Sequence, residues 1–154
     1  MQQPSSHITL APPVIYLLFI GFNLLLSWQL PWGGDGQNPW LRYLGWGLID
    51  AGVLLIAWAA ILMYRFKTTI NPFKKPSALL VEGPYRFSRN PIYLGDTLIF
   101  LGIGLLLSSW WTVLLLPPLI LCMNEGVIRR EETLLNGIFA EHYAHYCSHV
   151  RRWL

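Results

Sequence analysis

The chain has 154 residues, of which 54% are apolar and only 12% are charged, with a formal net charge of +3. So few charges exclude an ordinary soluble domain, and nothing in the small net charge indicates a nucleic-acid-binding surface. Eight Trp and seven Tyr suit a protein with two membrane interfaces. We therefore expect one all-α integral membrane domain covering residues 1–154.

The first apolar segment covers residues 14–30. The residues before it carry no Lys or Arg and no small-residue cleavage site, so we expect no secretory signal peptide. The segment itself is uncharged and just long enough to cross a hydrocarbon core of about 30 Å. We expect Asn23 in its middle to form a helix–helix hydrogen bond, and Tyr16 to be a lipid-facing anchor.

A turn-rich loop bracketed by Trp32 and Trp40 leads to the second predicted span, residues 41–64. This span contains one acidic residue, Asp50. A charge at that depth is costly in lipid and normally faces protein or a cavity. Two interpretations stay open: a protonated or paired structural residue, and a residue of a substrate pocket.

A basic loop precedes a run of 28 uncharged residues, 97–124. One straight helix of that length would span about 42 Å, which is too long without a marked tilt. The pair Ser108-Ser109 offers a break. We therefore predict a tight helical hairpin, with spans at about 91–107 and 110–124.

Four spans explain the distribution of positive charge. They place ten of the eleven Lys and Arg residues on one side, with Arg42 as the exception. Because positive charge is retained in the cytoplasm, we expect a multi-pass protein of a bacterial inner membrane with both termini cytoplasmic.

The C-terminal part should be helical and amphipathic. Residues 125–135 contain strong helix formers and continue the fourth span beyond the membrane, and Asn136-Gly137 is a C-cap signal. A final cytoplasmic helix should follow. Its apolar stripe consists of Phe139, Tyr143, Tyr146, Val150 and Trp153.

The most informative stretch is 83–95, where the basic loop becomes a membrane helix. Gly83-Pro84 is a turn signal, and Pro91 suits the first turn of a helix, where its missing N–H is not needed. The stretch contains two Arg, Arg86 and Arg89, and two Tyr, of which Tyr85 follows the turn and Tyr93 stands just after Pro91. A basic anchor with interfacial aromatics explains these residues singly but accounts less well for their grouping.

Four motifs stand in order along the second half of the chain. They are Gly83-Pro84-Tyr85-Arg86, Arg89-Asn90-Pro91-x-Tyr93, Glu131-Glu132 and Phe139-x-x-x-Tyr143-x-x-Tyr146 with Val150-x-Arg152-Trp153. This half, residues 65–154, resembles the isoprenylcysteine carboxyl methyltransferase family, which is similar to the phospholipid methyltransferases. The first two spans carry none of the resemblance.

The resemblance implies a membrane methyltransferase that binds S-adenosyl-L-methionine at the cytoplasmic face and needs no metal. It implies cofactor contacts from Ser77, Ala78, Leu79, Leu80, Tyr85, Asn90, Pro91, Ile92, Tyr93 and Glu131. For the chemistry we expect Arg129, Glu132 and Asn90 of this chain to be the catalytic residues. A sulfonium is attracted to aromatic faces, and an ammonium group favours a carboxylate.

The chain departs from the family at three positions. Asn90 stands where His is frequent, and Ala140 stands where Gly is usual. The Arg that binds the substrate carboxylate falls by spacing at Val127, so Arg129 or Arg130 would have to replace it.

Other interpretations remain. The spacing of His142, His145 and His149 would suit metal ligands but fits a solvated surface better, and the two Cys give no disulfide framework. Glu131 and Glu132 could merely pair with neighbouring Arg residues. The expected acceptor is lipophilic, a prenylcysteine-like carboxylate or another lipid-like molecule. The rival functions are an NADPH-dependent membrane reductase related to sterol reductases and a non-catalytic scaffold.

Overall fold

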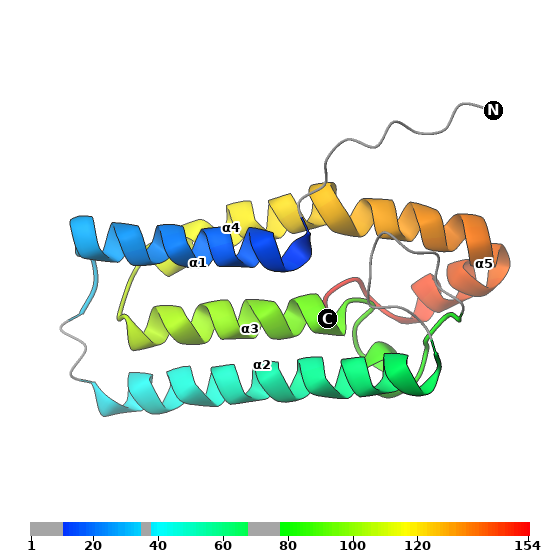
Figure 1. Cartoon of the computed structure of the whole chain (residues 1–154), viewed down its shortest axis with the longest axis horizontal. Helices are drawn as coiled ribbons and strands as arrows, with labels where there is room; N and C mark the ends of the chain where they lie inside the picture. The colour runs from blue at the N-terminus through cyan, green and yellow to red at the C-terminus, as the bar shows by residue number, and fades with distance from the viewer. Residues whose placement is uncertain (1–10, 35–37, 68–77) are drawn as a thin grey trace.

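The computed structural model describes residues 11–34, 38–67 and 78–154. Four helices run alternately in opposite directions along one axis, and a fifth continues beyond the fourth (Figure 1). The long helices are α1 (Pro12–Gln29), α2 (Pro39–Arg65), α3 (Pro91–Leu106), α4 (Trp111–Met123) and α5 (Arg129–His149). A 3-10 turn, η1 (Gly83–Arg86), precedes α3, and a π-helical turn, η2 (Asn124–Ile128), joins α4 to α5.

The all-helical prediction is confirmed, and the four predicted spans agree with α1 to α4 to within two residues at each end. Within the part of the chain that the structure describes, three helical stretches are long and apolar enough to cross a membrane: Pro12–Gln29, Pro39–Arg65 and the continuous stretch Trp111–His149. The shorter apolar helix is α3. The apolar part of the third stretch ends before Arg129, where α5 begins with four charged residues.

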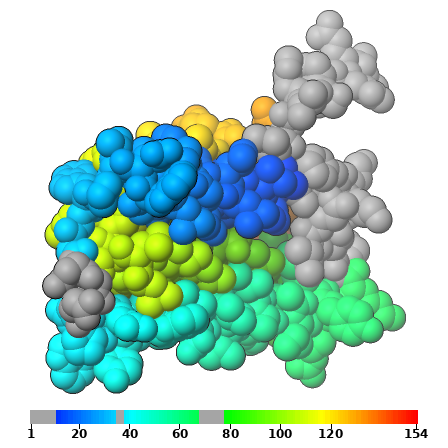
Figure 2. All heavy atoms as spheres, turned by 60° about the vertical axis from the view of Figure 1, so that its left-hand side comes forward, coloured from blue at the N-terminus to red at the C-terminus, as the bar shows by residue number. Residues whose placement is uncertain are grey.

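α3 is the central helix, lying between α2 on one side and α1 with α4 on the other (Figures 1 and 2). α2 and α3 approach closely because glycines face each other at two levels. A Cβ on Gly52 would lie 2.5 Å from the carbonyl oxygen of Gly95, and one on Gly102 would lie 2.6 Å from that of Gly45. Small residues let helices in lipid gain backbone contact that side chains would prevent.

Polar side chains join α1 to the hairpin instead. The Asn23 amide donates to Thr112 Oγ1 at 2.8 Å, and the Ser27 hydroxyl donates to Ser109 Oγ at 2.7 Å. The predicted helix–helix hydrogen bond of Asn23 is therefore confirmed. The predicted break at Ser108-Ser109 is confirmed too, since α3 ends at Leu106 and α4 begins at Trp111.

Tyr16 corrects a prediction. It is buried within the bundle rather than facing lipid, with 4% of its surface exposed. Its hydroxyl donates to the carbonyl of Tyr93 at 2.9 Å and lies 2.9 Å from Thr97 Oγ1. An apolar run gives no sign of which side faces the bundle, so the residue looked like an interfacial anchor.

The C-terminal helix also differs from its prediction. Asn136-Gly137 does not end a helix, since α5 continues through it to His149. The direction changes instead at Ala140, whose φ of 37° and ψ of −110° are not helical. Helix formers on both sides of Gly137 outweigh the local C-cap signal. The predicted apolar stripe is correspondingly shortened, because Val150 and Trp153 lie beyond the helix in a tail that returns toward α3 (Figure 1).

The close contact between α2 and α3 can be tested with Gly52→Val. The added side chain would overlap the Gly95 carbonyl, so we expect a loss of roughly 1–3 kcal/mol in stability. Thermal unfolding in detergent measures it. Gly21→Val is the matched control, because a Cβ on Gly21 meets nothing within 4 Å. Equal melting temperatures for the two variants would contradict the packing described.

The kink gives a second prediction. Ala140 has a positive φ that favours glycine, a strain of about 1–3 kcal/mol for other residues. Ala140→Gly should therefore raise the melting temperature. Ala144→Gly, four residues later in regular helix, should lower it, since glycine in a helix costs about 0.5–1 kcal/mol. A lower melting temperature for both variants would show that Ala140 carries no strain.

Candidate functional site

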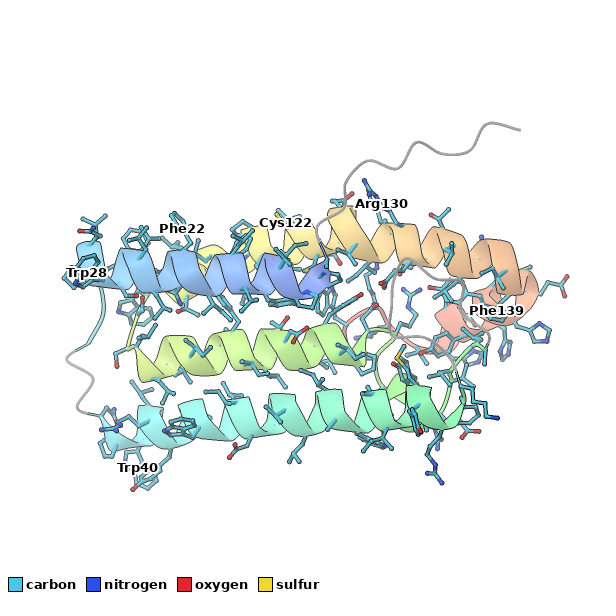
Figure 3. All side chains as sticks on the ribbon, in the orientation of Figure 1. Phe22, Trp28, Trp40, Cys122, Arg130 and Phe139 are labelled. Carbon is cyan, nitrogen blue, oxygen red and sulfur yellow. The ribbon has the colours of Figure 1, made fainter. Side chains whose placement is uncertain are left out.

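The candidate site lies at the end of the bundle where η1, the start of α3, α5 and the C-terminal tail meet (Figure 1). The opposite end holds the end of α1 and the start of α2. Trp28 and Trp40 lie at that opposite end (Figure 3), and both are 78% exposed. The two ends are therefore different in kind: one presents exposed aromatic rings and the other gathers charged side chains.

The Gly-Pro turn fixes η1 against α2. Gly83 has a φ of +56°, and a Cβ there would lie 3.3 Å from Trp58 Nε1 and 3.4 Å from Leu62. Glycine is thus favoured both by backbone conformation and by close contact. The turn directs Tyr85 inward, where it packs in a small cluster with Ala59 and Leu80.

Tyr85 is the most unusual residue of this cluster. It is 7% exposed, and its hydroxyl group is buried with no hydrogen-bond partner among the described residues. Its backbone carbonyl, by contrast, accepts a 2.6 Å hydrogen bond from Tyr146. Burial raises the pKa of Tyr85, and the nearby Tyr146 and Glu131 raise it further, so the hydroxyl stays protonated. A buried donor without a partner is rare and marks a place where a ligand can bond.

Glu131 links α5 to the start of α3. The Tyr93 hydroxyl donates to Glu131 Oε1 at 2.6 Å. Burial raises the pKa of Glu131, the hydrogen bond from Tyr93 opposes that rise, and the neighbouring Glu132 adds to it. This carboxylate is therefore held in place by one donor, with accepting capacity left over.

Glu132, although adjacent in sequence, reaches in another direction. Arg152 donates to both of its oxygens, from Nε at 2.9 Å and from Nη2 at 2.6 Å, and Arg89 Nη1 lies 3.3 Å away. The hydrogen bonds to Glu132 raise the pKa of Arg152 further. Paired bonds of this kind fix geometry as well as charge.

A cleft of about 480 Å³ opens beside this ion cluster. It is lined by Arg89, Arg129, Glu132, Thr133, Asn136, Tyr143, Ala144, Cys147 and Arg152. Three arginines against one glutamate leave the lining positive. Nη1 of Arg89 lies 2.6 Å from the Cys147 sulfur, while its Nε is buried with no partner among the described residues. The cleft is thus suited to a negatively charged group.

Asn90 is engaged with the C-terminal tail. Its side-chain amide donates to the carbonyl of Arg152 at 3.0 Å, and the N–H of Arg89 donates to Arg151 at 3.0 Å. The hydroxyl of Ser88, 1% exposed, accepts from the N–H of Asn90 at 3.1 Å. The turn before α3 therefore holds the tail that carries Arg152 to Glu132.

The other residues that the sequence predicts for the site lie either around Tyr85 or at the edge of the cleft, apart from one that is not described. Pro91 is buried, Leu80 and Ile92 pack around Tyr85, and Ala78 and Leu79 are partly buried. Arg129 is exposed and pairs with Glu125, one turn before it, as well as lining the cleft. Ser77 lies outside the described residues.

Sequence reasoning gave no role to Arg152 or Cys147. Arg152 stood inside a quoted motif, but its meeting with Glu132, 20 residues earlier, depends on the kink at Ala140. Among the described residues no group of three or more His, Cys, Asp or Glu is placed to hold a metal ion. His145 and His149 stack with ring centroids 4.5 Å apart on the exposed side of α5.

Comparison with known proteins gives one family and one relative. The family model described as phospholipid methyltransferase matches residues 40–142. The chain is 28% identical over 132 residues to the cobalt-zinc-cadmium resistance protein CzcN of Cupriavidus metallidurans. That match covers 86% of this chain and 56% of the relative, so the chain spans little more than half of the relative's length. No solved structure gives a significant match.

The orphaned hydroxyl of Tyr85 can be tested in the ligand-free protein. Tyr85→Phe removes a buried donor that lacks a partner, which should stabilise the fold by about 1–3 kcal/mol and raise the melting temperature. Tyr146→Phe removes a hydroxyl that is bonded, so it should lower the melting temperature. If Tyr85→Phe lowers it as much as Tyr146→Phe does, the hydroxyl has a partner within the protein.

Proposed function

The chain belongs to the phospholipid methyltransferase family, and from that premise we propose that it transfers a methyl group from S-adenosylmethionine to a lipophilic acceptor. The reaction takes place at the cytoplasmic membrane face. The acceptor class that we favour is the carboxylate of a prenylcysteine-like or other lipid-like molecule.

One observation carries the cofactor assignment: the Tyr93–Glu131 pair with the unpaired Tyr85 hydroxyl nearby. S-adenosylmethionine supplies an electrophilic methyl group on a sulfonium, together with an ammonium, a carboxylate and an adenosine. Glu131 would hold the ammonium, with Tyr93 fixing the position of the carboxylate. The Tyr85 hydroxyl would donate a hydrogen bond to a polar atom of the cofactor. No described residue supplies an acceptor for it.

The positively charged cleft suits the negatively charged groups that remain, which are the carboxylates of the cofactor and of the acceptor. Arg89 has a free Nε buried beside it, and Arg129 reaches it from α5. Glu132 would act as a positioning residue, since it holds Arg89 and Arg152 in place. Arg129 is the residue we propose for the acceptor's carboxylate. Asn90 would serve the site by fixing the tail that bears Arg152.

The chemistry asks little of the protein beyond alignment. Displacement at a sulfonium carbon needs the nucleophile held in line, and positioning can supply several kcal/mol of the barrier. A carboxylate is already a nucleophile, whereas an amine acceptor would first have to lose a proton to a base. Closure of the site by α5 and the tail would exclude water, which would otherwise compete for the methyl group.

The topology follows from the same arrangement. We propose four crossings, α1 to α4, with the site end of the bundle in the cytoplasm of a bacterial cell. α1 begins and α5 continues at that end (Figure 1), and ten of the eleven Lys and Arg residues then lie on that side. The acceptor would enter from the bilayer, between apolar helix surfaces.

Glu131→Gln tests the cofactor assignment. The change keeps size and shape but removes a charge-assisted interaction of about 1.5–3 kcal/mol, so S-adenosylmethionine affinity should fall roughly ten- to a hundredfold. Isothermal titration of the purified protein measures it. Glu141→Gln, an exposed carboxylate on the same helix, is the matched control and should bind as the wild type does.

The pH dependence has a definite sign. The raised pKa of Glu131 means that its carboxylate forms only above the usual range for glutamate. Cofactor affinity should therefore weaken as the pH falls through that raised pKa, and Glu131→Gln should flatten the dependence. The contribution of Glu131 to the stability of the ligand-free protein has the opposite sign. Because its pKa is raised in the folded state, this contribution decreases as the pH rises. Unchanged affinity in Glu131→Gln, or tight binding of NADPH in place of S-adenosylmethionine, would contradict the proposal.

A further inference from the structure

α2 is the outermost helix of the bundle. It packs against α3 and η1, and it forms one edge of the molecule (Figures 1 and 2). Its inner face carries Gly45, Gly52 and Ala59, which are buried at seven-residue intervals. The opposite face has no neighbouring helix among the described residues.

A regular stripe of exposed residues runs along that opposite face. Its members are spaced 4, 3, 4, 3, 4 and 3 apart, the heptad spacing with which two helices wind around each other. We name this the outer stripe: Tyr43, Gly47, Asp50, Leu54, Ala57, Ile61 and Tyr64, all exposed. Gly47 and Ala57 are small, and a Cβ on Gly47 would meet nothing within 4 Å.

The acidic residue sets this face apart from an ordinary lipid-facing surface. Asp50 lies close to the middle of the 27-residue helix, two residues from its centre. None of the ion pairs among the described residues includes it. An acidic side chain at the centre of a span is costly in lipid and normally faces protein or water. Asp50 is exposed on the face of α2 away from α3, and no described residue pairs with it, so we infer that its protein partner belongs to another chain.

We propose that the outer stripe is the interface of a two-fold dimer in which α2 of one copy packs against α2 of a second copy. Copies inserted with the same orientation present parallel α2 helices, so each residue of the stripe meets its own counterpart at the same depth. Asp50 then faces Asp50 of the partner subunit. One protonated carboxyl can donate to the other carboxylate, which satisfies both groups away from water.

The other residues of the outer stripe are also compatible with packing against α2 of a second copy. Gly47 lies one turn before Asp50 and lets the two backbones approach, as small residues do in membrane helix pairs. Leu54 and Ile61 supply apolar contact on the other side of the acid pair. Tyr43 and Tyr64 fall near the two ends of the helix, at the depths where aromatic side chains favour the membrane interface. A single polar position in a heptad stripe specifies register.

Cysteine cross-linking tests the contact. Leu54→Cys, in a Cys122→Ala background reconstituted into phosphatidylcholine vesicles, should form a disulfide-linked dimer on mild oxidation. Leu17→Cys is the control, since Leu17 is equally exposed on α1 but outside the stripe, at 66% against 69% for Leu54. Equal yields at the two positions, or no dimer at either, would overturn the proposal.

Two substitutions then test the role of the acid. Asp50→Asn keeps a group that can hydrogen-bond to its counterpart, so dimer affinity measured by energy transfer in the same vesicles should be retained. Asp50→Leu should weaken association roughly five- to thirtyfold, the range for one polar contact between membrane helices. Asp50 is exposed and forms none of the ion pairs among the described residues, so thermal unfolding of the monomer in detergent should be alike for both variants. Full dimer affinity in Asp50→Leu would overturn the assignment of the acid pair.

Discussion

The hydrogen bond between Tyr93 and Glu131 joins the two halves of the candidate site. Tyr93 stands in the first turn of α3, at the centre of the bundle, and Glu131 stands in the first turn of α5. The position of each depends on another contact. Tyr16 of α1 bonds to the Tyr93 carbonyl, and the π-helical turn η2 sets the direction in which α5 leaves α4. A shift in either would separate the carboxylate from the aromatic cluster around Tyr85.

Two different kinds of contact hold the helices that carry this bond. Between α2 and α3 the backbones meet at glycines, which gives many weak van der Waals contacts. Between α1 and the hairpin, amide and hydroxyl groups pair, from Tyr16 at one end to Ser27 at the other. Burying a polar side chain costs little free energy when it is hydrogen-bonded to a partner. Such pairs also define the register between neighbouring helices more sharply than apolar packing does. These hydrogen bonds connect α1 to α3 and to the start of α4. They therefore hold the start of α3 in place relative to the helices that lead to α5.

Much of the fold could be predicted because the membrane imposes simple rules. Apolar runs predict the four helices to within two residues, and the length of the uncharged run 97–124, together with the distribution of positive charge, favours the break at Ser108-Ser109. The site is harder to predict, since its parts meet through features that the sequence indicates only weakly, such as Ala140 at a position where the resembling family usually has Gly. Ala140 adopts a backbone conformation expected of glycine, and the resulting kink brings Arg152 back to Glu132. The inward face of α1 was equally hidden, because a uniformly apolar helix does not reveal the side on which Tyr16 packs.

The claim at the centre of this account is methyl transfer to a lipid-like acceptor. The most direct test supplies S-adenosylmethionine with an isotopically labelled methyl group to the purified protein in vesicles that contain a lipid extract of its host. A methyltransferase of this kind should place label in the organic phase, in a product identified by mass spectrometry, with no consumption of NADPH in a parallel sample. Label that stays in the aqueous phase while NADPH is oxidised in the parallel sample would contradict it.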